Sequence, residues 1–424
     1  MGKFDEIVGY EYIKREFEDL AYTLEHSKEL AARGVRIPRG LMLHGGIDRG
    51  KKFMANVFAE ATGREIFYFD GFSDMDDQFK ELAEFESRMT DEGAYLVLIS
   101  DMHELVRDES VSDALRTFAE SSKNRDVFIL ATANSTDPIQ GAWFSENLIP
   151  LKIFVDRPGL SDSVEMIEHL LEEKQLVSKV SADDIANIFA MNTYSELDTC
   201  ISNAVAHMSA SGAEKLRRED VIREAERLNF KYRSGVKPVN KQKMLSRALH
   251  EAAHVVVGEI LEPGIIGIAQ ILPTGDAIEG GCTCRNADWD DEIHHIAMSL
   301  APLALPGLGY ETDCYGSSGD IHKARENAVS LVAENGMRGL DRIALSDENE
   351  QYSEWYLQRQ ESAIVNLLDD KLEEAEKILA DNREFLDAVA DMICRKGSIL
   401  ASEIRLIKKK CGHGSVGKIK QAKE

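Results

Sequence analysis

The sequence is poor in cysteine, proline and tryptophan, and it contains no long hydrophobic run. Its 424 residues include 6 cysteines, 9 prolines and 3 tryptophans. The cysteines form no CxxC pair, which argues against a disulfide framework and favours a reducing compartment. The longest apolar stretches, such as 95–99, have the length of a strand, whereas a membrane-spanning helix needs about 20 residues. We therefore expect a cytoplasmic chain without a membrane anchor.

Positive charge is also scarce. The chain has 50 Lys and Arg residues against 75 Asp and Glu residues, which gives a formal net charge of −25. So acidic a surface repels phosphate, and we expect no nucleic-acid partner. The exception is a locally basic tail at 413–424, which is typical of a solvated chain end.

Short apolar runs alternate with helical periodicity in the first third of the chain. Such runs are typical of buried strands, and they lie at 40–44, 65–69, 95–99 and 127–131. Helical patterns separate them, for example at 51–62 and 77–89. Because strands and helices alternate, we predict a parallel sheet with helices on both faces.

The remainder of the chain is mainly helical. We predict helices over 161–228, with Ser181 and Ser195 as N-caps. Further helices surround a β-like segment at 263–281, and the segment 369–410 is charged and helical. The predicted organisation is an α/β domain, a small helical domain, a linker, a mainly helical domain and a basic tail, at 1–158, 159–230, 231–243, 244–412 and 413–424.

An HExxH pattern at 250–254 is the strongest chemical signal. His250 and His254 are four residues apart, so on a helix both imidazoles face the same side and can bind one Zn²⁺ ion. Glu251 lies beside them and could act as a general base on a water molecule. The alternative is an ordinary buried helix whose two histidines are satisfied by hydrogen bonds.

A catalytic zinc ion normally takes three protein ligands, so a third must come from elsewhere. Glu279 follows His254 by a plausible interval but lies in a glycine-rich segment that we interpret as a turn. Asp320 is the better candidate, because it opens a helical run and would be held rigidly. On the local pattern alone, an ordinary carboxylate that stabilises a helix start is the better interpretation of Asp320.

A GxxxxGK loop lies between the first predicted strand and the following helix. Its residues are Gly45, Gly46, Ile47, Asp48, Arg49, Gly50 and Lys51. Such a loop binds phosphate through backbone N–H groups and a helix N-terminus, and Lys51 would reach the terminal phosphates of ATP or ADP. Two features oppose this: Lys52 replaces the Ser or Thr that binds Mg²⁺, and Asp48 adds negative charge.

The strand at 95–99 should end in an acidic pair that binds Mg²⁺ and activates water. The sequence there is Ser100-Asp101-Met102. Whichever residue takes the first acidic position, one of the two functions is lost or weakened. We predict weak binding of ATP or ADP, no firmly held Mg²⁺ and no fast hydrolysis. A phosphate loop that serves only the fold is the alternative.

The order of these features resembles the FtsH family of AAA+ zinc proteases, from residue 4 to about 407. The resemblance also includes the segments 4–9, 37–40, 131–134, 192–198 and 316–321. It implies an α/β P-loop AAA+ module with a small helical lid, followed by a mainly α-helical zincin-type peptidase domain. It implies a nucleotide-sensing position for Asn134, and it favours Asp320 over Glu279 as the third zinc ligand.

The chain departs from the family in its ATPase half. The segment 72–79 is too short for the family's aromatic pore loop, and no GRFDR-like stretch after Asn134 supplies arginine fingers. We expect no counterpart of the family's two N-terminal membrane helices. The family forms hexameric rings, but without arginine fingers the reason for a ring is weaker. We expect unfolded proteins or short peptides as substrates.

Three functional interpretations fit the sequence. In the first, the chain is a zinc metalloendopeptidase in which His250, His254 and Asp320 bind Zn²⁺ and Glu251 is the base. In the second, it is a nucleotide-binding scaffold with a structural zinc ion. In the third, it is a working ATP-dependent protease with a slow ATPase.

Overall fold

The computed structural model describes residues 2–70, 75–146, 148–229, 241–274, 277–284, 292–312, 318–337 and 354–411. The chain divides into two compact units. The first comprises Met1–Glu172 and Asn192–Thr199, and the second comprises Glu173–Met191 and Cys200–Glu424. The predicted domain boundaries lie at other positions and stay predictions. The tail at 413–424 and most of the predicted linker, 231–240, lie outside the described residues.

The first unit is built on a five-stranded parallel sheet with the strand order β2-β3-β4-β1-β5. Its strands are β1 (Gly40–His44), β2 (Glu65–Phe69), β3 (Ala94–Ile99), β4 (Asp126–Ala133) and β5 (Leu151–Phe154). The four apolar runs are thus confirmed as strands. The edge strand β5 was not predicted, because it has only four residues and three of them are exposed.

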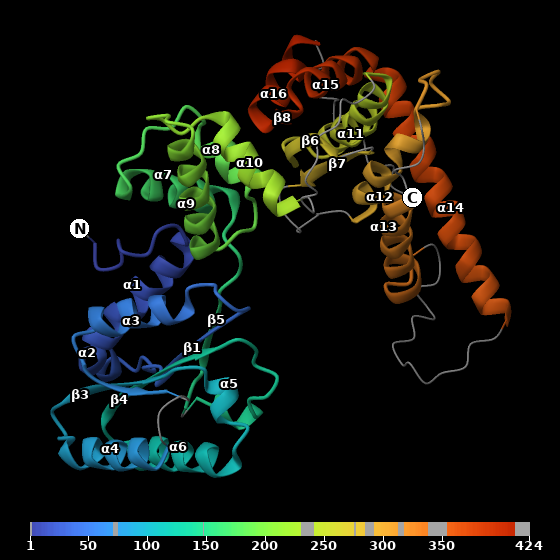
Figure 1. Cartoon of the computed structure of the whole chain (residues 1–424). Coiled ribbons are helices and arrows are strands. Elements are labelled where there is room, and N and C mark those ends of the chain that lie inside the picture. Colours follow the sequence, from blue (N-terminus) through green and yellow to red (C-terminus); the bar gives the residue numbers. More distant parts are fainter. Residues whose placement is uncertain are drawn as a thin grey trace. The chain divides into compact units, whose positions relative to one another are not determined.

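Helices cover both faces of this sheet (Figure 1). They are α1 (Glu11–Glu25), α2 (Ser27–Ala32), α3 (Lys51–Ala61), α4 (Met75–Arg88), α5 (Met102–Leu105) and α6 (Glu109–Ser121), with a 3₁₀ turn at Gly141–Phe144. Helix α7 (Leu160–Glu173) follows β5 and contacts α9 (Tyr194–Ala210) through His169 and Tyr194. On one face Phe17 contacts Phe58, and Phe58 contacts Phe128 of β4. On the other face α4 and α6 bury Phe85 and Phe118 against the strands. The predicted layered architecture is therefore confirmed.

A long buried helix and a small antiparallel sheet form the core of the second unit. Helix α11 (Lys241–Leu261) begins inside the predicted linker and is buried from Ala248 to Glu259. It packs against α15 (Arg383–Lys396) and against the sheet, whose strand order is β7-β6-β8. The predicted β-like segment is a hairpin of β6 (Ile266–Thr274) and β7 (Ala277–Cys284).

The third strand of this sheet, β8 (Ser398–Leu400), comes from near the C-terminal end of the chain. A three-residue strand has too little periodicity to be recognised in the sequence. Because β8 pairs with β6, the sheet joins segments that are more than one hundred residues apart.

A second cluster of helices completes this unit. It comprises α12 (Glu292–Leu300), α13 (Ser318–Val329), the π-helical segment Ser330–Glu334 and α14 (Glu354–Asp381), which share a small apolar core. A 3₁₀ turn, Ala301–Ala304, follows α12. The mainly helical character predicted here is confirmed. Although α14 has 28 residues, no helix in the described part of the chain has the length and apolar character needed to cross a membrane.

The helices α8 (Ala182–Ile188), α9 (Tyr194–Ala210) and α10 (Arg218–Asn229) fall in the predicted helical region. Ser181 caps α8 as predicted, because its hydroxyl accepts a hydrogen bond from Asp184 N. The prediction for Ser195 was wrong, since this residue lies within α9. Thr193 caps that helix instead: its Oγ1 accepts from Glu196 N, and Glu196 Oε2 accepts from Thr193 N. Helix α16 (Ala401–Lys410) ends the described chain.

Candidate functional site

The HExxH residues lie on the most buried part of α11. Alanine and valine residues around them pack against β6 and α15, which fixes the rotation of the helix about its axis. As the spacing predicts, His250 and His254 occupy one face of the helix, one turn apart. Glu251 points beside them, and all three side chains are buried.

Asp320 meets these two histidines although it is 66 residues further along the chain than His254. Its Oδ2 lies 3.2 Å from His250 Nε2 and 3.7 Å from His254 Nε2, and the two Nε2 atoms are 3.3 Å apart. Ligands of a tetrahedral zinc ion with bonds of 2.0–2.2 Å are about 3.4 Å from one another. The three atoms therefore have the spacing that one zinc ion requires, and the donor set of two imidazoles and a carboxylate suits it.

A backbone carbonyl orients His254. Its Nδ1 lies 2.8 Å from the carbonyl oxygen of Met298 on α12, to which the ring N–H donates. This bond leaves the lone pair of Nε2 directed toward His250 and Asp320. Metal-binding histidines are commonly oriented by such an outer hydrogen bond. No local sequence pattern predicts this contact, because it depends on how α11 and α12 pack.

The electrostatic environment favours an ionised Asp320. Burial alone would raise the pKa of this carboxyl, but hydrogen bonds from His250 and His254 outweigh it and lower the pKa. Burial lowers the pKa of His250. Burial also disfavours a charged His254, yet the bond to Asp320 and the nearby carboxylates raise its pKa. An ionised Asp320 and a neutral His250 are the forms in which these groups bind a metal.

Glu251 contacts an arginine that sequence reasoning overlooked. Arg247 Nε lies 3.3 Å from Glu251 Oε1, and Arg247 Nη2 donates to the carbonyl oxygen of Gly280 on β7, also at 3.3 Å. The two side chains are four residues apart on α11, and this i, i+4 spacing could have revealed the pair. The edge strand, the arginine and the glutamate thus form one contiguous group.

The alternative third ligand, Glu279, lies on β7 rather than in a turn, which corrects the prediction for its segment. Its side chain is outside the described residues. Asp320 lies in the first turn of α13, where the helix dipole stabilises a carboxylate. Residues 316–317 of the turn that precedes it are also outside the described part.

The phosphate-loop sequence connects β1 to α3 as predicted. Gly45 passes so close to Val155 that an added Cβ would overlap its carbonyl oxygen, so this position requires glycine. Gly50 has a φ of 74°, and Asp48 adopts a φ of 59° with its side chain exposed. Ile47 is also exposed, at 70%.

Two cations of the loop contact backbone carbonyls of the protein itself. Lys51 is buried, and its Nζ lies 2.5 Å from the carbonyl oxygen of Gly46. Burial, together with the charge of Arg49, lowers the pKa of Lys51. Arg49 donates to the carbonyl oxygen of Val155 and to Asp156.

The remaining predicted nucleotide residues lie beyond the carboxyl ends of β1, β3 and β4. Lys52 Nζ is 2.5 Å from Asp101 Oδ2. The backbone N–H of Asn134 donates to His103 Nδ1 at 3.3 Å, and that histidine is buried. The loop, Asp101 and Asn134 therefore lie at the same end of the sheet, beyond the carboxyl ends of its strands. Residues 72–74 of the shortened pore-loop segment lie outside the described residues.

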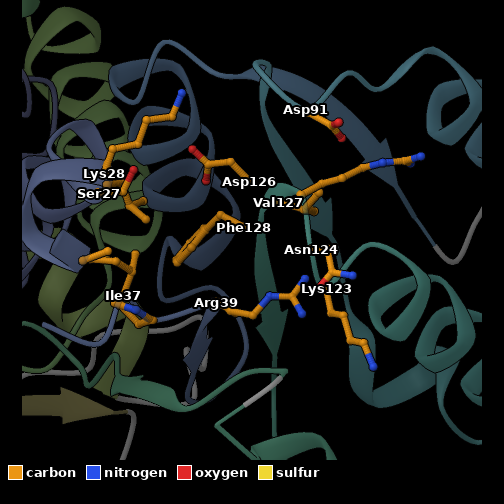
Figure 2. A pocket seen from close by; sticks show the side chains of 14 residues that line it. Ser27, Lys28, Ile37, Arg39, Asp91, Lys123, Asn124, Asp126, Val127 and Phe128 are labelled. Carbon is orange, nitrogen blue, oxygen red and sulfur yellow. The ribbon is translucent and has the colours of Figure 1, made fainter. Parts of the chain in front are cut away.

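A pocket of about 340 Å³ lies at the opposite end of the same sheet, beside the amino ends of its strands. Figure 2 shows Arg39, just before β1, and Asp126 at the start of β4 among its lining side chains. Phosphate-binding residues follow the carboxyl ends of these strands, whereas this pocket lies at their amino ends. It is therefore separate from the loop.

The sequence is similar to that of AAA ATPases in its first part and to FtsH proteases over most of its length. The family model "ATPase family associated with various cellular activities (AAA)" matches residues 41–157. The chain is 22% identical over 447 residues to the ATP-dependent zinc metalloprotease FtsH of Mycoplasma mobile, covering 96% of this chain and 63% of the relative. It is 22% identical to FtsH 1 of Thermomicrobium roseum, covering 95% and 68%, and 21% identical to FtsH 2 of Salinibacter ruber, covering 95% and 64%. The chain thus spans about two thirds of the length of these curated relatives.

Proposed function

The chain carries an AAA domain and is FtsH-like over 95% of its length, and from this premise we propose that it is a zinc metalloendopeptidase. The observation that carries the proposal is the convergence of His250, His254 and Asp320 on one point beside Glu251. Two imidazoles and a carboxylate leave one of the four positions of a tetrahedral ion for water or substrate, as catalytic zinc sites do.

Each residue has a distinct part in the proposed reaction. His250, His254 and Asp320 would hold the ion, and bound zinc would supply Lewis acidity to a peptide carbonyl and to a water molecule. Glu251 would accept the proton of the attacking water and then donate it to the leaving amine. Arg247 holds Glu251 in place against Gly280, so the base is oriented before substrate binds.

The substrate would enter as an extended chain. Within the described residues β7 pairs only with β6, so its outer edge can accept another strand. Because Gly280 of this strand lies against Glu251, a peptide added along β7 would pass the base. We propose unfolded proteins or short peptides as substrates, since neither a pore loop nor arginine fingers were recognised in the sequence. The hexameric ring of the resemblance stays a prediction.

We further propose that the loop at 45–51 binds ATP or ADP weakly and does not support fast hydrolysis. Support comes from Lys52, whose ammonium pairs with Asp101 where hydrolysing relatives of this loop type hold Mg²⁺. This pair also favours the nucleotide-binding scaffold, as a second candidate function, over a working ATPase. In the scaffold the zinc ion would be structural and no peptide would be cleaved.

Replacing Glu251 with Gln tests the peptidase proposal. We expect peptide cleavage to fall about 10²- to 10⁴-fold, because the variant lacks the general base. Zinc content should not change, since Glu251 is not a proposed ligand. Hydrolysis of a quenched fluorescent casein peptide and elemental analysis measure the two quantities in the same preparation.

The matched control is Glu326→Gln, which makes the same change at an exposed position of α13. It should cleave at the wild-type rate. If wild-type protein binds zinc and cleaves nothing, the scaffold interpretation replaces the peptidase. If the Glu251 variant cleaves normally, Glu251 is not the base.

A further inference from the structure

A lysine occupies the position at which nucleotide-binding loops of this kind hold their metal ion. Lys52, the second residue of α3, follows β1, and Asp101 follows β3. Between these strands lies β4, so Lys52 reaches across one strand to place Nζ 2.5 Å from Asp101 Oδ2. Because β1, β4 and β3 run parallel, their carboxyl ends lie at the same end of the sheet.

This arrangement does not fit Mg²⁺. The ion needs oxygen ligands at 2.0–2.1 Å in octahedral geometry, normally from a hydroxyl at the position of Lys52 and a carboxylate at that of Asp101. Lysine has no oxygen to offer, and its ammonium already contacts the carboxylate. A divalent cation placed there would also be repelled by the lysine charge at short range.

The Asp101 end of the ion pair is firmly placed. Asp101 has a φ of 52°, and its backbone N–H donates to Thr132 Oγ1 of β4 at 3.1 Å. The Asp101 side chain is 15% exposed, whereas that of Lys52 is 50% exposed. The carboxylate is thus fixed to the sheet edge, while the lysine is accessible from solvent.

An ammonium group has three N–H donors, so it can bridge a carboxylate and phosphate oxygens much as a metal ion does. Lys51, Lys52 and Arg49 bring three cationic groups to the loop at the N-terminus of an 11-residue helix, although Arg49 and Lys52 also contact Asp156 and Asp101, and Asp48 adds one negative charge. The phosphates of metal-free ATP are not neutralised by Mg²⁺, so they gain more from contact with these cations than the phosphates of the Mg²⁺ complex do.

We propose that the loop binds the polyphosphate of ATP or ADP without Mg²⁺ and that the Lys52 ammonium takes the place of the metal. The inference rests on the nucleotide binding proposed above and is independent of the peptidase assignment. It makes Lys52 a specificity-determining residue that selects the metal-free form of the nucleotide.

Calorimetric titration of the full chain with ATP tests this, once in EDTA and once in excess Mg²⁺. We expect ATP to bind about tenfold more tightly in EDTA. Tighter binding in Mg²⁺ would overturn the inference and leave the nucleotide proposal standing. Heat-silent titrations, confirmed by equilibrium dialysis to show no binding in either buffer, would overturn both.

The Lys52→Thr variant restores the hydroxyl that Mg²⁺ requires. Its affinity in EDTA should fall roughly tenfold to a hundredfold, because a charge-assisted contact is lost, and Mg²⁺ should now tighten binding. Lys80→Thr is the matched control, since Lys80 is an exposed lysine of α4 paired with Asp77. It should show the wild-type preference for EDTA. If Lys52→Thr shows that preference too, Lys52 does not replace the metal.

Discussion

At the scale of single residues, His295 of α12 is a buried histidine held in its neutral form. Its Nδ1 lies 2.5 Å from Asn327 Nδ2, whose amide donates to it. Burial lowers the pKa of His295 to about 4, with further contributions from the positive charges of Lys323 and His254. The side chain therefore stays neutral in the folded chain over a pH range in which an unfolded histidine becomes protonated.

This predicts a loss of stability in mild acid. The folded pKa lies below the unfolded value of about 6.5, so between pH 6.5 and 4 only the unfolded chain takes up this proton. The free energy of unfolding should fall by about 2 kcal/mol between pH 7 and pH 5 on account of His295. Urea denaturation of the chelator-treated protein at both pH values measures it.

The variant His295→Gln keeps a hydrogen-bonding group without the titration, so its stability should depend less on pH. His322→Gln is the control, because His322 is an exposed histidine of α13. Equal pH dependence in wild type and His295→Gln would show that His295 does not cause the loss.

At the scale of secondary-structure elements, the approach of β7 to α11 determines where Glu251 lies. A Cβ added at Gly280 would overlap the Glu251 carboxylate and contact Arg247. Only a glycine on the strand permits this distance between strand and helix. The base is therefore positioned by backbone as much as by its own helix.

Gly280→Ala should displace Glu251 while leaving the proposed zinc ligands in place. We expect peptide cleavage to fall roughly a hundredfold, as a misplacement of about 1 Å can cost. Zinc content should stay at the wild-type level, and elemental analysis beside the peptide assay will show whether it does.

Gly319→Ala provides the comparison. A Cβ at Gly319 meets nothing within 4 Å, and the residue lies in the first turn of α13, next to Asp320. Cleavage by this variant should be unchanged. Unaltered cleavage by Gly280→Ala would mean that the contact does not position the base.

At the scale of the whole molecule, parts of the predicted lid region join the C-terminal segments within the second unit. Asp184 of α8 is buried and accepts hydrogen bonds from the backbone and hydroxyl groups of Ser402 on α16. Arg218 of α10 donates to Glu403 and to the carbonyl oxygen of Ser398. These contacts link segments that are about 180–220 residues apart.

Substitutions at two neighbouring aspartates compare how much a buried and an exposed contact contribute to the free energy of unfolding. Asp184→Ala should lower the free energy of unfolding by about 2 kcal/mol, because it removes a buried carboxylate and leaves two partly buried donors of Ser402 unpaired. Asp183→Ala removes only an exposed ion pair with Arg405 and should cost less than about 1 kcal/mol. Urea denaturation of both variants gives the comparison. Equal losses would contradict a structural role for the Asp184–Ser402 contact.

Local patterns in the sequence predicted the elements better than their connections. The strands β1, β3 and β4 are apolar runs whose burial could be recognised, whereas β2 is an edge strand that buries only Phe69, and β5 and β8 have four and three residues. The cap of α9 was misassigned to Ser195, although Glu196 three residues after Thr193 forms a capping box with Thr193. That spacing would have identified the correct residue.

The candidate site also combines features that local spacing predicts with features that depend on tertiary packing. Helical spacing alone brings His250 and His254 together, but the approach of Asp320 depends on how α13 packs, and no local pattern encodes it. In the sequence, Lys52 and Asp101 are two separate differences from the residues that bind Mg²⁺ in nucleotide-binding loops of this type. Their ion pair follows only from the strand order, which places the ends of β1 and β3 on either side of β4.

The late position of β8 has a consequence for synthesis of the chain. The core around α11 includes Phe385, Ile399 and Ile404, and β6 gains its second partner only when Ser398–Leu400 is present. While the ribosome is still translating the codons before these residues, the helix that bears both histidines has no complete core to pack into. Domains fold as units during translation. The proposed metal centre can therefore be complete only after residues 398–404 have been synthesised.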